Sequence, residues 1–264
     1  MHIIFLDGES KSGKTAVGRS ILKVLTEQNM NARLLVAGNF FRQLTLLTLG
    51  RKPVNVDDDS WLEPAVRQSL QDPALYSEAN THALEQDSVE QLVSKIGALD
   101  FVQDMVTEWR INSAQKAVED GINLLILDGR NSRQRLTGWL AQTGTVVALD
   151  LNIFCRPEVA GARRLSDEGN TNPTDQELSA ATQEVIKRRQ RDRERAQAAY
   201  TDPVDPVELV VGAHSVDDAL SQAFADNVEN PPRPIRFDNS EVSREDGLST
   251  VTELALKAVQ RLQG

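Results

Sequence analysis

The chain has 264 residues, of which 40% are hydrophobic and 26% charged, a balance typical of a globular protein rather than a disordered one. Its formal net charge of −10 argues against a general nucleic-acid binder, because neutralising phosphates requires a basic surface. The single cysteine excludes an internal disulfide framework. No apolar run has the length of a membrane span, and the first residues do not form a signal peptide. We therefore expect a cytoplasmic protein.

The first part of the chain alternates strand and helix patterns. Residues 3–6 form an apolar run typical of a buried parallel strand, and the glycine-rich stretch GESKSGKT (8–15) follows directly. A helix is predicted from Lys14, then a strand over 32–37 and a helix over 39–49 that ends at a glycine. This alternation predicts an α/β fold with a doubly wound parallel sheet and helices on both faces.

Further along, residues 51–87 are polar and aperiodic, so loops and short helices are expected there. The later helices are predicted over 88–97 and 99–119, from Pro157, from the capping box of Thr174 and Glu177 to about Ala199, and after the Ser-x-x-Asp patterns at 215–218 and 243–246. The later strands are predicted over 122–128, 145–151, 207–211 and 234–238. Only one of the last two strands is needed for the core sheet, and 132–144 is read as a loop.

The stretch from Gly8 to Thr15 has the full pattern of a phosphate-binding loop. Successive backbone N–H groups can wrap a phosphate chain, Lys14 can reach the β- and γ-phosphates, and Thr15 can face Mg²⁺. The helix that follows adds its positive N-terminal end. A chance match in a surface loop is the alternative, but the strand before and the helix after are the required context. The candidate ATP-binding residues are Gly8, Glu9, Ser10, Lys11, Ser12, Gly13, Lys14 and Thr15.

Asp128 ends the predicted strand 122–128. Ligands of parallel sheets lie outside the carboxyl ends of the strands, so Asp128 and the phosphate loop would open into one crevice. The alternative is a turn residue before Gly129. With ATP as phosphoryl donor, Thr15 and Asp128 are the candidate magnesium ligands.

A cationic stripe is the third candidate feature. On the predicted helix from Asp175, one helical face carries Arg188, Arg191, Asp192 and Arg195. A charge run is usually a solvated face, and that alternative stays open. However, phosphoryl transfer needs cations over the migrating group, and a phosphate acceptor needs no general base, which agrees with the lack of a His or Cys motif. The candidate catalytic residues are Lys14, Asp128, Arg163, Arg164 and Arg188.

The order of these motifs resembles the bacterial cytidylate kinase family of P-loop nucleoside monophosphate kinases. The resemblance rests on the phosphate loop, LDGRN (127–131), ARRL (162–165) and IKRRQRDRER (186–195), and it covers about residues 1–200. It implies phosphoryl transfer from Mg-ATP to a nucleoside monophosphate, with CMP or dCMP the first expected acceptor. It also implies one P-loop kinase domain over 1–264, with an acceptor-binding insertion over about 38–119, a short lid over about 163–176 and a C-terminal extension over about 201–264. The acceptor-binding residues that it implies are Arg42, Ser94, Gln103, Arg130, Asn131, Arg188, Asp192 and Arg195, while Arg163 and Arg164 resemble lid arginines that reach the ATP phosphates.

The chain departs from the family mainly where the family reads the base. Gln103 stands at an arginine position and Asn131 at an aspartate position, and both normally help to hold cytosine; Lys11 replaces the usual glycine. Acceptor identity therefore stays open. The alternatives are a P-loop kinase for another small metabolite and a nucleotide-binding regulatory module without turnover. We expect a monomer with small-molecule nucleotides as partners and neither nucleic acid nor membrane; the role of residues 201–264 stays open.

Overall fold

The computed structural model describes residues 1–9, 11–53, 58–76, 87–196, 206–211, 213–225 and 232–262. The chain divides into two compact units, one of Met1–Leu35 with Ala114–Gly264 and one of Val36–Ser113. The second unit covers nearly the same residues as the predicted insertion over 38–119. Its part in acceptor binding and the organisation as one domain stay predictions.

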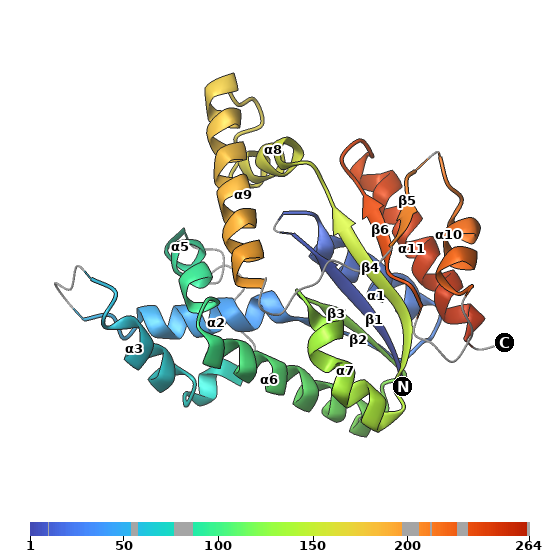
Figure 1. The fold of residues 1–264 in the computed structure, drawn as a ribbon, viewed down its shortest axis with the longest axis horizontal. Helices are drawn as coiled ribbons and strands as arrows, with labels where there is room; N and C mark the ends of the chain where they lie inside the picture. The colour runs from blue at the N-terminus through green and yellow to red at the C-terminus, as the bar shows by residue number, and fades with distance from the viewer. Residues whose placement is uncertain are drawn as a thin grey trace. The chain divides into compact units, whose positions relative to one another are not determined.

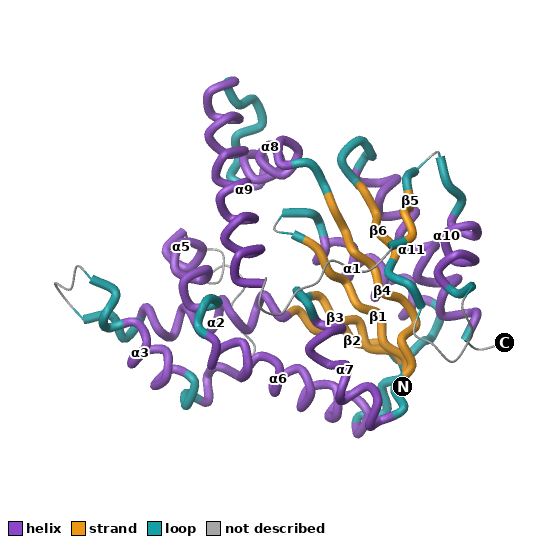
Figure 2. Tube along the Cα trace, viewed as in Figure 1, coloured by secondary structure: helices purple, strands orange, loops and turns teal. Residues whose placement is uncertain are grey.

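A six-stranded parallel sheet forms the centre of the first unit, in the order β2-β3-β1-β4-β6-β5 (Figures 1 and 2). Its strands are β1 (His2–Gly8), β2 (Ala32–Val36), β3 (Leu124–Asp128), β4 (Val146–Phe154), β5 (Val207–Leu209) and β6 (Ile235–Asp238). This confirms the predicted fold class. Both C-terminal strands join the sheet, although only one was needed to complete the predicted core: β6 pairs with β4, and β5 pairs with β6.

Apart from α7, the helices of the first unit begin where local signals predict. The helices of this unit are α1 (Lys14–Glu27), α7 (Ser132–Thr143), α8 (Pro157–Asp167), α9 (Asp175–Ala196), α10 (Val216–Ala223) and α11 (Arg244–Arg261). Pro157 is the first residue of α8. At the start of α9 the backbone N–H of Thr174 donates to the Glu177 carboxylate at 2.8 Å, and the Glu177 N–H donates to the Thr174 hydroxyl at 3.3 Å. These contacts confirm the predicted capping box.

The segment 132–144 was expected to be a loop, and this prediction is wrong because the segment contains α7. The helix buries Ser132, Leu136 and Trp139, which follow one another at helical spacing on one face. It lies against β1 (Figure 1). Two apolar residues on one buried face, with Gly138 between them, are too weak a periodic signal to identify a helix from sequence.

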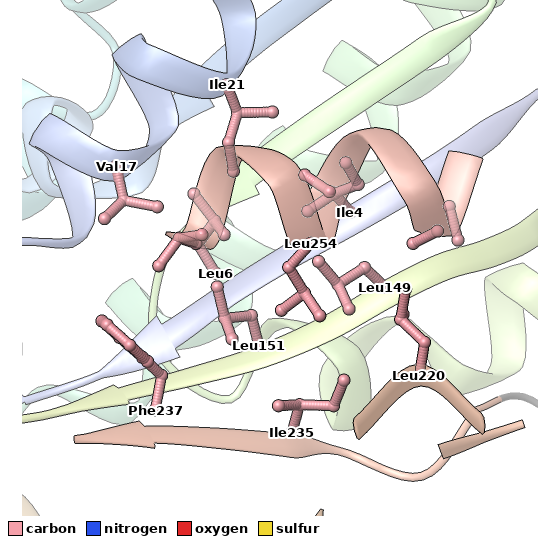
Figure 3. Close-up of a cluster of buried hydrophobic side chains, with 14 of the residues drawn as sticks. Ile4, Leu6, Val17, Ile21, Leu149, Leu151, Leu220, Ile235, Phe237 and Leu254 are labelled. Atoms are coloured by element: carbon pink, nitrogen blue, oxygen red, sulfur yellow. The ribbon is translucent and has the colours of Figure 1, made fainter. Parts of the chain in front are cut away.

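The core of the first unit includes residues from both ends of the chain. Ile4 and Leu6 of β1 project to the face of the sheet that α1 covers with Val17, and Phe237 of β6 and Leu254 of α11 join the same cluster (Figure 3). All five side chains are at most 4% exposed. Burial of one large apolar side chain is worth about 1.5–3 kcal/mol. The C-terminal extension is therefore part of the core and not an appendage.

The second unit is helical. It contains α2 (Ala37–Leu49), α3 (Leu62–Ser69), the short 3₁₀ helix η1 (Pro73–Tyr76), α5 (Asp87–Ile96) and most of α6 (Asp100–Glu119), which continues into the first unit. Its apolar cluster includes Phe40, Leu44, Val66, Ile96 and Val102. The region 51–87 was expected to hold loops and short helices, and its described part does hold α3 and η1.

Candidate active site

The glycine-rich loop runs from the carboxyl end of β1 into α1. Gly8 has φ 137°, and a Cβ at this position would lie 2.2 Å from the carbonyl oxygen of Ile153, so only glycine fits. Gly13 has φ 95°. Lys11 also has a left-handed backbone, with φ 59°, although a side chain disfavours that conformation. The loop therefore takes the tight, glycine-dependent turn that a phosphate loop requires.

Lys14 is at the centre of a charged cluster. Its Nζ donates to the carbonyl oxygen of Glu9 at 2.6 Å. Burial lowers the pKa of Lys14 to about 8; nearby Asp128 opposes this lowering, and Arg130 and Arg188 add to it. The structure thus brings the lysine of the phosphate loop together with three other residues that the sequence analysis selected from β3, the following turn and α9.

Thr15 and Asp128 contact each other directly. Thr15 Oγ1 donates to Asp128 Oδ2 at 2.5 Å, and Asp128 is 4% exposed. This contact favours the site role of Asp128 over a role in a surface turn. Hydroxyl and carboxylate oxygens suit Mg²⁺, which takes only one or two protein ligands when phosphates and water complete its coordination. The described residues contain no cluster of three or more His, Cys, Asp or Glu side chains that could hold a metal by themselves.

Asp7 is a site residue that the sequence analysis missed. Its Oδ1 accepts a hydrogen bond from the Gly8 N–H at 2.7 Å, and its Oδ2 accepts one from the Asn131 N–H at 2.6 Å. Removal from water raises the pKa of Asp7, while the two N–H groups and Lys14 oppose that rise. Asp7 therefore links the phosphate loop to Asn131, whose φ is 53°. The available signal was an ionisable residue at the end of an otherwise apolar strand.

The two predicted lid arginines have different partners. Arg163 donates through Nη1 to Asn239 Oδ1 at 3.0 Å and through Nη2 to the Asn239 carbonyl at 3.1 Å. Arg164 forms ion pairs with Glu168, at 2.8 Å, and with Glu184. Arg163 is thus tied to a residue beside the phosphate loop, whereas Arg164 pairs with the C-terminal end of its own helix and with α9. Whether either residue reaches ATP stays a prediction.

Two ion pairs join the phosphate loop to α8 and α9. Glu9 pairs with Arg189 of α9 at 2.8 Å, and Lys11 pairs with Asp167 of α8 at 3.1 Å. Arg189 is 5% exposed and also donates to the carbonyl oxygen of Cys155 at 2.9 Å. The sequence analysis chose Arg188 and overlooked Arg189.

A sequence signal for Arg189 did exist. Ala181 and Val185 are buried on α9, and Arg189 continues their spacing of four residues along one helical face. A cation on that stripe needs an anionic partner, since an unpaired buried charge is costly. The partner, Glu9, lies too far away in the chain for any local pattern to identify it.

The predicted acceptor residues divide between the two units. Arg42, Ser94 and Gln103 lie on α2, α5 and α6 of the second unit, where Gln103 Nε2 donates to the Gly97 carbonyl at 2.6 Å. Arg130, Asn131 and Arg188 lie in the first unit. Outside what the structure describes are Ser10 and the side chains of Arg191, Asp192 and Arg195, although α9 runs through the last three.

The parallel sheet, the glycine-rich loop between β1 and α1, and the Lys14, Thr15 and Asp128 cluster define a P-loop nucleotide-binding protein. A protein-family model described as Cytidylate kinase matches residues 4–227. The chain belongs to the cytidylate kinase family and is an ATP-dependent nucleoside monophosphate kinase. This confirms the predicted family. No curated protein matches the chain significantly. Within the described ranges, no helix combines the length and apolar character needed to cross a membrane.

Proposed function

We propose that this kinase transfers the γ-phosphoryl group of Mg-ATP to CMP or dCMP and forms the diphosphate. The observation that carries this proposal is the family match, which spans residues 4–227 and so includes the phosphate loop, the LDGRN turn and the arginine-bearing helix α9. ATP and a nucleoside monophosphate follow from the family; the cytosine base and the roles of individual residues are the proposed part.

The donor side of the site binds the triphosphate through the phosphate loop. The backbone N–H groups of the loop and the N-terminus of α1 face the phosphate chain, and Lys14 exchanges its bond to the Glu9 carbonyl for the β- and γ-phosphates. Thr15 and Asp128 would hold Mg²⁺, which, when bound, neutralises charge on the β- and γ-phosphates. The Ser12 Oγ is buried and has no hydrogen-bond partner among the described residues, so a phosphate oxygen can satisfy it.

The transfer step needs positive charge and alignment more than proton removal. An oxygen of the acceptor phosphate attacks the γ-phosphorus, the bond between this phosphorus and the bridging oxygen breaks, and ADP leaves with that electron pair. Arg130 and Arg188 lie close enough to Lys14 to lower its pKa. In the proposed mechanism these two arginines and Lys14 stabilise the charge on the transferring group, since preorganised cations need little rearrangement as that charge develops.

The side-chain hydrogen bond of Gln103 favours weaker discrimination among acceptors. The Gln103 amide donates to the Gly97 carbonyl at 2.6 Å, so part of its hydrogen-bonding capacity already holds the turn between α5 and α6. Asn131 has a structural task through its backbone: its backbone N–H donates to Asp7, and its backbone takes a left-handed conformation that asparagine tolerates well. Gln103 therefore has less capacity for base recognition, and we expect weaker discrimination between CMP and other monophosphates.

The test is a coupled ADP-release screen of the purified protein with Mg-ATP against CMP, dCMP, UMP, AMP, GMP and dTMP. We expect turnover with CMP and dCMP, a weaker signal with UMP, and no turnover by Lys14→Ala. Turnover with only a purine monophosphate would refute the cytosine assignment. A protein that binds ATP in calorimetry but turns over no acceptor would favour the regulatory module.

A further inference from the structure

We propose that Asn239 is a positioning residue of the donor site, where it fixes both the phosphate loop and Arg163. Asn239 follows β6 directly and lies beyond residue 227, where the family match ends. The inference rests on the proposed function only in so far as the loop binds ATP, and it assigns a task to a C-terminal segment whose role the sequence left open.

Every polar group of Asn239 has a partner. Its backbone N–H donates to the Phe154 carbonyl at 3.0 Å and its Nδ2 donates to the Ser12 carbonyl at 2.7 Å. Its Oδ1 and its carbonyl oxygen accept from the two terminal nitrogens of Arg163 at 3.0 and 3.1 Å. Asn239 is 9% exposed, and a Cβ on Gly13 would lie 3.4 Å from its Nδ2. The amide therefore packs closely on the second half of the phosphate loop.

The bond to Ser12 has a direct consequence for anion binding. A phosphate loop binds through backbone N–H groups, so a carbonyl oxygen that turned toward the phosphates would repel them. Donation from Asn239 Nδ2 occupies the Ser12 carbonyl and holds it in place. Because Ser12 is fully buried, water cannot easily substitute for this donor if it is lost.

The bonds to Arg163 place a cation beside the same loop. A free arginine side chain loses rotamer entropy when it is fixed, and Asn239 fixes Arg163 before ATP binds. The guanidinium has five N–H donors, so donors remain for a phosphate oxygen after two bonds to Asn239. One side chain thus orients a loop carbonyl and an arginine together.

Asparagine suits this position because its short side chain ends in an amide that carries both a donor and an acceptor. Aspartate has the same shape and can still accept from Arg163, but it cannot donate to the Ser12 carbonyl when ionised. It would also bring a negative charge toward bound phosphates. Asn239→Asp therefore separates the two tasks of the residue better than truncation does.

The experiment measures ATP binding by calorimetry without acceptor, together with KM for ATP and for CMP. Asn239→Ala removes the side-chain hydrogen bonds to Ser12 and Arg163, so we expect it to weaken ATP binding at least about tenfold. Asn239→Asp should weaken ATP binding more, while KM for CMP changes less than twofold. Ser240→Ala is the matched control. The Ser240 hydroxyl accepts from the Arg156 N–H and donates to Asp238, and it makes no hydrogen bond to the described residues of the loop. The ATP affinity of this variant should therefore match the wild type.

A double-mutant cycle tests the link to Arg163. If Asn239 acts partly through Arg163, the combined Asn239→Ala and Arg163→Ala variant should lose less ATP affinity than the product of the two single losses. Unchanged ATP binding in Asn239→Asp would overturn the proposal. So would a lowered Tm together with KM values for ATP and for CMP that rise by the same factor. Because ATP binding is read without an acceptor, a failed CMP assignment would leave this result unaffected.

Discussion

ATP binding should weaken as the pH rises through about 8, because Lys14 loses its proton in the empty site. Burial lowers the pKa of Lys14 from 10.5 to about 8. One pKa unit corresponds to about 1.4 kcal/mol, so keeping this ammonium charged costs the empty site roughly 3 kcal/mol. Bound phosphates favour the charged form and raise the pKa again. The complex therefore takes up a proton that the free protein has lost.

The expected size of this effect follows from linkage. The Kd for ATP should be constant below pH 7 and rise by up to about tenfold per pH unit above 8. Calorimetry at pH 7, 8 and 9 in two buffers with different ionisation enthalpies measures both Kd and proton uptake, and uptake at pH 9 should approach one proton. Lys14→Met should bind weakly at every pH, with no uptake. Equal Kd values at pH 7 and 9, with no proton taken up by the wild type, would refute the reasoning.

The same ionisation has an opposite effect on the stability of the nucleotide-free protein. Between pH 8 and 10.5 the unfolded chain keeps the Lys14 proton and the folded chain does not. The unfolded state therefore binds more protons, so this group makes the free energy of unfolding rise with pH in that window. Denaturant titrations across this window should show that the free energy of unfolding of the wild type rises with pH relative to that of Lys14→Met.

Three substitutions give further tests. Glu9→Ala leaves the 5% exposed Arg189 without its carboxylate partner. The free energy of unfolding should therefore fall by about 2 kcal/mol, and thermal unfolding should show a Tm lower by roughly 4–8 °C. An unchanged Tm would mean that the ion pair contributes nothing to stability. Arg188→Ala should lower kcat/KM for the acceptor tenfold or more, while ATP binding in calorimetry changes little. Wild-type kinetics in this variant would mean that Arg188 is a solvated surface charge without a role in acceptor use. Gln103→Arg combined with Asn131→Asp should raise kcat/KM for CMP relative to UMP, unless the wild type already rejects UMP in the same assay.

Features carried by short, local patterns could be predicted from the sequence. The phosphate loop, the strand that ends at Asp128 and the capping box at Thr174 depend on neighbouring residues, and each was predicted at its correct place. α7 could not be predicted, because its polar sequence is stabilised by two side chains buried against the sheet. A helix of this kind forms through tertiary packing, which overrides weak local preference.

The contacts that complete the candidate site could not be predicted for a different reason. Asn239 and Ser12 are 227 positions apart in the chain, and Glu9 and Arg189 also come from two distant stretches of the first unit. Each residue by itself has an ordinary surface-type side chain, and only the fold gives it a partner. A single sequence carries no signal for such pairs, although the apolar spacing before Arg189 showed that this side chain points inward.

The strand order has a consequence for how the chain is made. β6 lies between β4 and β5 in the sheet, yet β5 leaves the ribosome first and has no neighbour to pair with until β6 follows. The sheet therefore closes through a late insertion between strands that already exist, a step dominated by contacts distant in sequence and expected to be slow. Asn239 comes directly after that strand, so full affinity for ATP should be among the last properties that a newly synthesised molecule acquires.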